Sequence, residues 1–148
     1  MSSQLAPITW RPDRPRYGED GLTALTMERV VQTFNSRTKH RPSDEMLGAL
    51  SAIPTAVSGI VNGTAPAAYH LCALDTGVGK TTTLAETIRQ LRRPDMPWGR
   101  QDGGTIICVG RYTQIEALVE DMGLRQEEFA VLVGKGPEAD KVRARGSA

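Results

Sequence analysis

The sequence predicts an α/β fold, in which a parallel sheet is flanked by helices and preceded by a helical segment. Apolar runs at residues 68–74, 105–109 and 129–133 have the length and composition of buried strands. Helical patterns follow the first two runs, and such alternation is typical of a parallel sheet. A loop with two glycines and the sequence Gly-Lys-Thr joins the first run to its helix.

Two helices are expected ahead of the first strand. From Thr23 to about Arg37, apolar residues recur at the spacing of one helical face, at Met27, Val30, Val31 and Phe34. The second helix follows Ser43, whose hydroxyl can cap it, and Asn62-Gly63 ends it. Its expected apolar positions are Met46, Leu50, Ile53, Val57 and Ile60. Pro54 lies inside this run and is expected to kink or split the helix.

The loop at residues 75–82 carries the strongest functional signal. A triphosphate is a dense anion, and a helix N-terminus offers it unpaired N–H groups and the positive end of the helix dipole. Gly77 and Gly79 can adopt positive φ, so the backbone can curl around the β-phosphate. Lys80 adds a positive charge for the β- and γ-phosphates, and the Thr81 hydroxyl can ligate Mg²⁺. With ATP and Mg²⁺ as ligands and Lys80 as the catalytic candidate, the expected phosphate-binding residues are Thr76, Gly77, Val78, Gly79, Lys80, Thr81 and Thr82.

The match to the phosphate-loop pattern G-x-x-x-x-G-K-[ST] is partial, because Leu74 stands at the first glycine position. Leu74 is therefore expected to adopt a conformation that glycine reaches more easily. The alternative is an ordinary strand-to-helix turn with a surface lysine. The strand and helix expected on either side favour the phosphate loop.

Beyond the loop, a helix is expected with Ile115, Leu118, Val119 and Met122 on one face, ended by Gly123. Cys72 and Cys108 fall inside expected strands, so we interpret them as buried thiols in a reducing compartment. The net charge of +1 gives no overall attraction to nucleic acid or membrane. With no signal-peptide pattern and no membrane-spanning apolar run, a cytoplasmic protein is expected.

Residues 74–81, with helical sequence before them, resemble the first motif of the DEAD/DEAH-type helicases of superfamily two. The resemblance covers about residues 43–134 and implies a partial RecA-like P-loop NTPase domain. It aligns Gly110 and Arg111 with the family's second motif, which tracks the backbone of a bound strand. Arg111 is thereby implied as a contact to single-stranded or duplex nucleic acid, with an exposed helix-start arginine as an equal alternative.

The chain departs from that family in the chemistry of hydrolysis. No acidic Asp-Glu motif follows an expected strand, and the length leaves no room for a second motor domain. Hydrolysis needs a carboxylate that holds Mg²⁺ and a group that orients water. We therefore expect an N-terminal fragment of a helicase-like motor that binds nucleotide with little turnover alone. A second motor domain or a partner protein would complete its site.

Two alternatives remain open at this point, a small P-loop kinase and a non-enzymatic nucleotide-binding or regulatory protein. The long segment before the loop disfavours the kinase. The expected organisation is a disordered arm at residues 1–21, an incomplete P-loop NTPase domain at residues 22–134 and a frayed polar tail at residues 135–148.

Overall fold

The computed structural model describes residues 21–37, 39, 41–66, 68, 70–75, 77–96, 105–134 and 136–137. These residues belong to two compact units, one within residues 1–102 and the other within residues 103–148. Throughout the described residues, all regular secondary structure is helical and no strand is present. The predicted parallel-sheet α/β fold is therefore wrong. The expected arm, except its last residue, and most of the expected tail lie outside the described residues.

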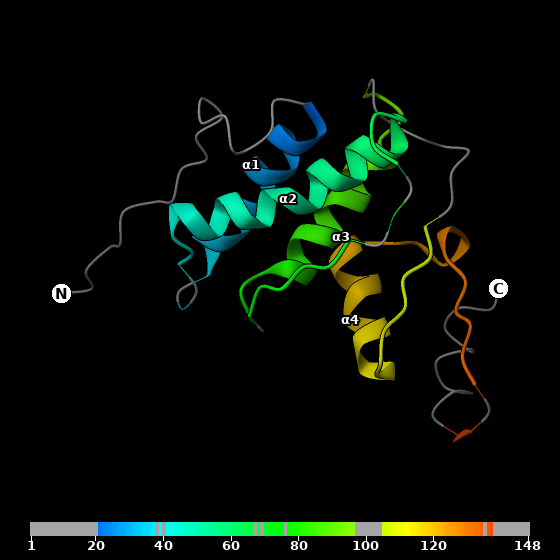
Figure 1. Ribbon diagram of the computed structural model, residues 1–148. Helices are drawn as coiled ribbons and strands as arrows, with labels where there is room; N and C mark the ends of the chain where they lie inside the picture. Colours follow the sequence, from blue (N-terminus) through cyan, green and yellow to red (C-terminus); the bar gives the residue numbers. More distant parts are fainter. Residues whose placement is uncertain are drawn as a thin grey trace. The chain divides into compact units, whose positions relative to one another are not determined.

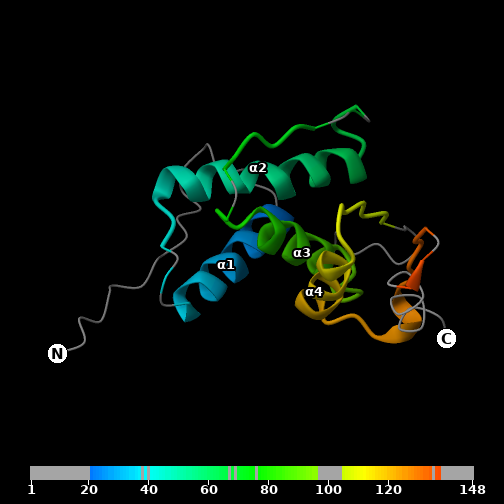
Figure 2. The ribbon, with the colours of Figure 1, turned by 90° about the horizontal axis from the view of Figure 1, so that it is seen from below.

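The first unit is built from α1 (Gly21–Ser36), α2 (Asp44–Val61) and α3 (Lys80–Leu91), each of which packs against the other two (Figures 1 and 2). The α1 helix confirms the helix predicted from Thr23 to about Arg37. The core lies between α1 and α2 and consists of Met27, Val30, Val31, Phe34, Leu47 and Leu50. Because α3 contacts both other helices, it buries side chains over much of its circumference: Thr83, Ala85, Thr87, Ile88, Gln90 and Leu91.

The α2 helix begins as predicted and continues through its proline. The Ser43 hydroxyl accepts a hydrogen bond of 3.2 Å from the Met46 backbone N–H, which is the expected N-cap. Pro54 is buried inside a helix that is continuous over Asp44–Val61, so of the expected kink or split, the split is wrong. Of the predicted apolar positions, Leu50 is in the core and Met46 and Ile53 pack against it partly buried. The buried face differs from the prediction in its other members; it consists of Leu47, Leu50, Ser51, Pro54 and Ser58.

The second unit contains α4 (Tyr112–Met122) and the short 3-10 helix η2 (Gln126–Glu128). The predicted end at Gly123 is confirmed, since this residue adopts φ 60° and its N–H bonds to the Glu120 carbonyl at 2.9 Å. The Arg125 backbone N–H then donates to the Glu128 carboxylate at 2.8 Å, which fixes the start of η2.

The three expected strands are apolar segments without ladder partners in the described residues. Their side chains Leu71, Ile106 and Leu132 are 95%, 89% and 95% exposed. Cys72 and Cys108 are also exposed, so their predicted burial is wrong. The physical reason is that a strand is stable only when neighbouring strands pair with it, whereas helices satisfy their own backbone. None of the described helices combines the length and apolar character needed to cross a membrane.

Candidate phosphate-binding loop

The loop before α3 has the backbone that the motif predicts. Gly77 and Gly79 adopt φ of 80° and 105°, in the left-handed region that favours glycine, and α3 begins at Lys80. Among the described residues, no other residue type has positive φ, so the strained conformation expected of Leu74 is wrong. Leu74 is instead half-buried and packs, together with Val78, against the core of α1 and α2. An apolar anchor thus occupies the position where the common pattern has glycine.

Gly79 is held against the largest core side chain of the unit. A Cβ at this position would overlap Cζ of Phe34, which is fully buried in α1. Glycine therefore suits position 79 for two independent reasons, its positive φ and the contact with Phe34. The contact fixes the turn of the loop to the hydrophobic core.

The α3 N-terminus presents donors next to a lysine amine. The first backbone bond within α3 joins the Thr83 N–H to the Gly79 carbonyl at 2.9 Å. The N–H groups of the three preceding residues therefore belong to the first turn, where a helix has no internal acceptors. The Lys80 Nζ donates to the Leu74 carbonyl and closes the loop on itself. Helix N-H groups, helix dipole and amine lie together here, as an anion site requires.

The threonines of the loop differ in their surroundings. Thr81, the predicted Mg²⁺ ligand, is exposed at the second position of α3. Thr82 is half-buried, and Thr76 lies outside the described residues. Within the described residues, no cluster of three or more His, Cys, Asp or Glu side chains suits a metal ion. A single hydroxyl still fits Mg²⁺, because this ion takes most of its ligands from phosphate oxygens and water.

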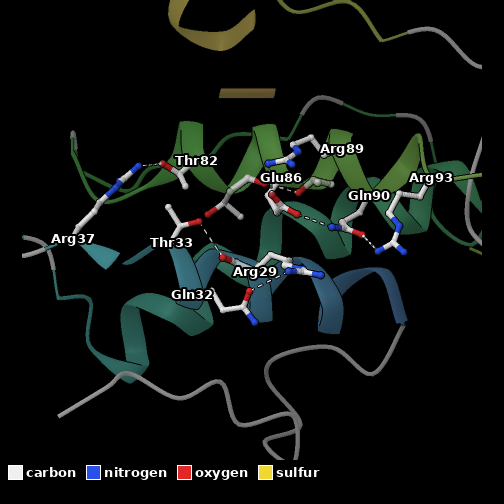
Figure 3. Close-up of polar contacts among 11 residues, drawn as sticks. Arg29, Gln32, Thr33, Arg37, Thr82, Glu86, Arg89, Gln90 and Arg93 are labelled. Atoms are coloured by element: carbon white, nitrogen blue, oxygen red, sulfur yellow. Dashed lines mark hydrogen bonds and ion pairs between the residues drawn. The ribbon is translucent and has the colours of Figure 1, made fainter. Parts of the chain in front are cut away.

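Arg37 is a site residue that the sequence analysis missed. Its guanidinium Nη2 donates to Thr82 Oγ1 at 3.5 Å (Figure 3). Its guanidinium carbon lies 5.7 Å from the Phe34 ring centroid. The contact places a second cation beside the first turn of α3. The sequence signal is weak, since it consists only of an aromatic residue followed three positions later by an arginine.

Arg111, the predicted nucleic-acid contact, belongs to the other compact unit. It is exposed directly before α4 in an extended conformation (φ −139°, ψ 141°) and makes no side-chain capping bond. The structure thus brings together the described residues of the loop, and the role of Arg111 as a nucleic-acid contact stays a prediction.

Comparisons of this chain with models of protein families, with curated proteins and with solved structures find no match.

Proposed function

We propose that this chain binds the phosphates of ATP, together with Mg²⁺, through residues 74–82. The observation that carries the proposal is the combination of two left-handed glycines with a helix that begins at Lys80. An ordinary turn before a helix needs neither a second left-handed glycine nor a lysine that bonds back to the start of the loop. Both features fit a backbone that wraps an anion.

Each residue has a separate task in the proposed complex. The N–H groups of the loop and first helical turn would donate to the β-phosphate, and Lys80 would exchange the Leu74 carbonyl for phosphate oxygens. Thr81 would hold Mg²⁺, which neutralises phosphate charge when it is bound. Arg37 would add a second positive charge beside Thr82.

The proposal concerns binding rather than turnover. The sequence supplies no acidic motif after an apolar run, and hydrolysis requires a carboxylate that holds the metal. A helicase-like motor remains a hypothesis that rests on the loop sequence alone, as does completion of the site by a second motor domain or a partner protein. We also propose a cytoplasmic location, where ATP is available and the free thiols of Cys72 and Cys108 stay reduced.

The test is a titration of a fluorescent ATP analogue with Mg²⁺ against the wild-type chain and Lys80→Ala. We expect Lys80→Ala to weaken binding about tenfold or more, because it removes charge-assisted hydrogen bonds to phosphate. Lys39→Ala is the matched control, since Lys39 is an exposed lysine outside the loop. Pyrophosphate should compete and adenosine should not. Equal affinities for wild type and Lys80→Ala would contradict the proposal.

A further inference from the structure

Two cations lie on opposite flanks of the first turn of α3. Successive residues of a helix are about 100° apart, so Lys80 and Thr82 lie about 200° apart, on either side of Thr81. Burial agrees with this arrangement, because Thr81 is exposed, whereas Lys80 and Thr82 are half-buried. On one flank, the Lys80 amine donates to the Leu74 carbonyl. On the other flank, the Thr82 hydroxyl accepts a hydrogen bond of 3.5 Å from Arg37 (Figure 3).

The Arg37 guanidinium is exposed and keeps unused N–H donors. It lies over the face of the Phe34 ring, an interaction that takes up none of its hydrogen bonds. The bond to Thr82 uses one of its five donors. No carboxylate of the described residues forms an ion pair with Arg37. Arg37 therefore offers both charge and hydrogen bonds to an anion.

The Phe34 ring fixes Arg37 relative to the phosphate loop. The edge of this ring lies against Gly79, where it would overlap an added Cβ, and its face carries Arg37. Phe34 is itself fully buried in the core of α1 and α2. One buried side chain thus sets the position of both the turn of the loop and the cation. Because Arg37 is ordered before a ligand arrives, binding would lose less side-chain entropy.

The direction of the phosphate chain decides which phosphate Arg37 meets. This inference rests on the proposed ATP complex, in which Lys80 contacts the β- and γ-phosphates. The three phosphates form a linear chain, and Arg37 lies on the flank of α3 opposite Lys80. The α-phosphate is therefore the one that lies on the Arg37 flank. A guanidinium suits this task, because its fork matches two phosphate oxygens at once.

We propose that Arg37 binds the α-phosphate of the nucleotide and that the Thr82 hydroxyl is a positioning group that orients the Arg37 guanidinium. Arg37 is then a specificity determinant, because ATP and ADP both carry an α-phosphate and pyrophosphate fills only the positions beside Lys80. The α1 helix thereby contributes to the site a residue that lies 45 positions before Thr82 and outside the loop motif.

The experiment measures the affinity of the full chain for ATP, ADP and pyrophosphate, each with Mg²⁺, by displacement of a fluorescent ATP analogue. Arg37→Gln should weaken ATP and ADP by the same factor of about tenfold or more, because both lose a charge-assisted contact. Pyrophosphate should bind this variant as it binds wild type. Lys39→Gln is the matched control, since Lys39 is an exposed cation two positions away, and it should change none of the three affinities.

The pattern over the three ligands can overturn the proposal in two ways. A loss confined to ATP would assign Arg37 to the γ-phosphate. An equal loss for pyrophosphate would show a general electrostatic effect rather than a contact to the α-phosphate. Arg37→Lys should recover only part of the affinity for ATP and ADP, because lysine keeps the charge but not the guanidinium fork.

An ATP analogue in which sulfur replaces a nonbridging oxygen of the α-phosphate tests the contact itself. Sulfur accepts hydrogen bonds weakly. The wild-type chain should therefore bind at least one of the two diastereomers more weakly than ATP, and Arg37→Gln should remove this difference. A merely structural role of Arg37 would leave the difference in place. No difference in wild type, or one that persists in Arg37→Gln, would overturn the proposal.

Two variants of Thr82 test its positioning role. Thr82→Val removes the hydroxyl and should weaken ATP by less than Arg37→Gln does, and the double variant should be no weaker than Arg37→Gln alone. Thr82→Ser keeps a hydroxyl and should bind ATP like wild type. Losses that multiply in the double variant would overturn this role, since they would show that the hydroxyl acts independently of Arg37.

Lys80→Ala separates this inference from the proposed function. If Lys80→Ala weakens ATP and Arg37→Gln does not, the chain binds ATP through its loop and the inference about Arg37 is wrong. If neither substitution changes the affinity for ATP, the proposed function and this inference are both wrong.

Discussion

The two compact units of this chain differ in how far they bury their apolar side chains. In the first unit, three helices enclose a core whose six residues are at most 4% exposed. In the described part of the second unit, α4 stands without a helical neighbour of comparable length and buries Leu118 and Met122. Two further apolar residues of α4, Ile115 and Val119, line an open groove of about 310 Å³ with Phe129 and Val131.

Apolar side chains form a core only where the backbone segments that carry them pack or pair with one another. The α1 and α2 helices are joined by a short connection and pack against each other, and α3 packs against both. The apolar runs that contain Ile106 and Leu132 have strand-like composition, but they have no paired neighbour in the described residues. Full burial of such a side chain stabilises a protein by about 1.5–3 kcal/mol. The second unit therefore lacks this contribution to its folding free energy.

The largest expected effect comes from removing the core aromatic of the first unit. We expect Phe34→Ala to lower the free energy of unfolding by about 3–5 kcal/mol, because Phe34 is fully buried. Phe129→Ala in the second unit should cost about 1 kcal/mol, since Phe129 is only half-buried. Urea unfolding followed by circular dichroism measures both. Similar losses would show that the two units are equally well packed.

Two glycines at helix ends offer a sharper comparison. Gly79 and Gly123 both have positive φ, and alanine in that region costs about 1–2 kcal/mol. A Cβ at Gly123 meets no atom within 4 Å, whereas one at Gly79 overlaps Phe34, and overpacking adds about 1–3 kcal/mol. Gly79→Ala should therefore destabilise more than Gly123→Ala in the same unfolding measurement. In a Phe34→Leu background, the excess cost at Gly79 should shrink; an unchanged excess would rule out the Phe34 contact as its cause.

Substitutions at the first residue of a helix cap should change stability in opposite directions in the two units. Ser43 caps α2 through its hydroxyl, so Ser43→Ala should cost about 1 kcal/mol. Arg111 precedes α4 without a side-chain cap, so Arg111→Asp should stabilise α4 by about 0.5–1 kcal/mol through a new cap and the helix dipole. Thermal unfolding midpoints report both changes. A lower midpoint for Arg111→Asp would contradict the assignment of an uncapped helix start.

The smallest expected effect concerns the acid response of the first unit. The hydrogen bond from Arg93, at 2.6 Å, holds the pKa of Asp95 below its ordinary value. A lowered folded pKa stabilises the protein above the unfolded pKa of about 3.9, and this contribution is lost as the pH falls through the folded pKa. Asp95→Asn should therefore lower the thermal midpoint slightly at pH 7 and leave it unchanged below the folded pKa. The pair is exposed, so the difference should be smaller than that of the capping variants.

Local signals in the sequence were sufficient for part of the fold. The periodicity around Met27 and Phe34, the Ser43 cap and the end of α4 at Gly123 are all confirmed. Each of these signals lies within a few residues of the structure it predicts, and helix ends depend on such local chemistry.

The features that sequence reasoning missed depend on residues far apart in the chain. An apolar run does not reveal whether another strand will pair with it, so the expected sheet and the expected burial of Cys72 and Cys108 are both wrong. Which face of α2 is buried depends on how α1 and α3 pack against it. Arg37 reaches Thr82 across 45 positions of sequence, a contact that only the packing of α1 on α3 creates.

The bond between Lys80 and the Leu74 carbonyl has a consequence for ligand affinity. In the proposed ATP complex, a phosphate oxygen would replace the Leu74 carbonyl as the acceptor of the Lys80 amine. The anion would compete with this internal acceptor, so the apparent affinity would scale with the fraction of molecules whose lysine is free. The same bond holds the amine at the loop rather than free in solvent, so the proposed complex would cost less side-chain rotamer entropy.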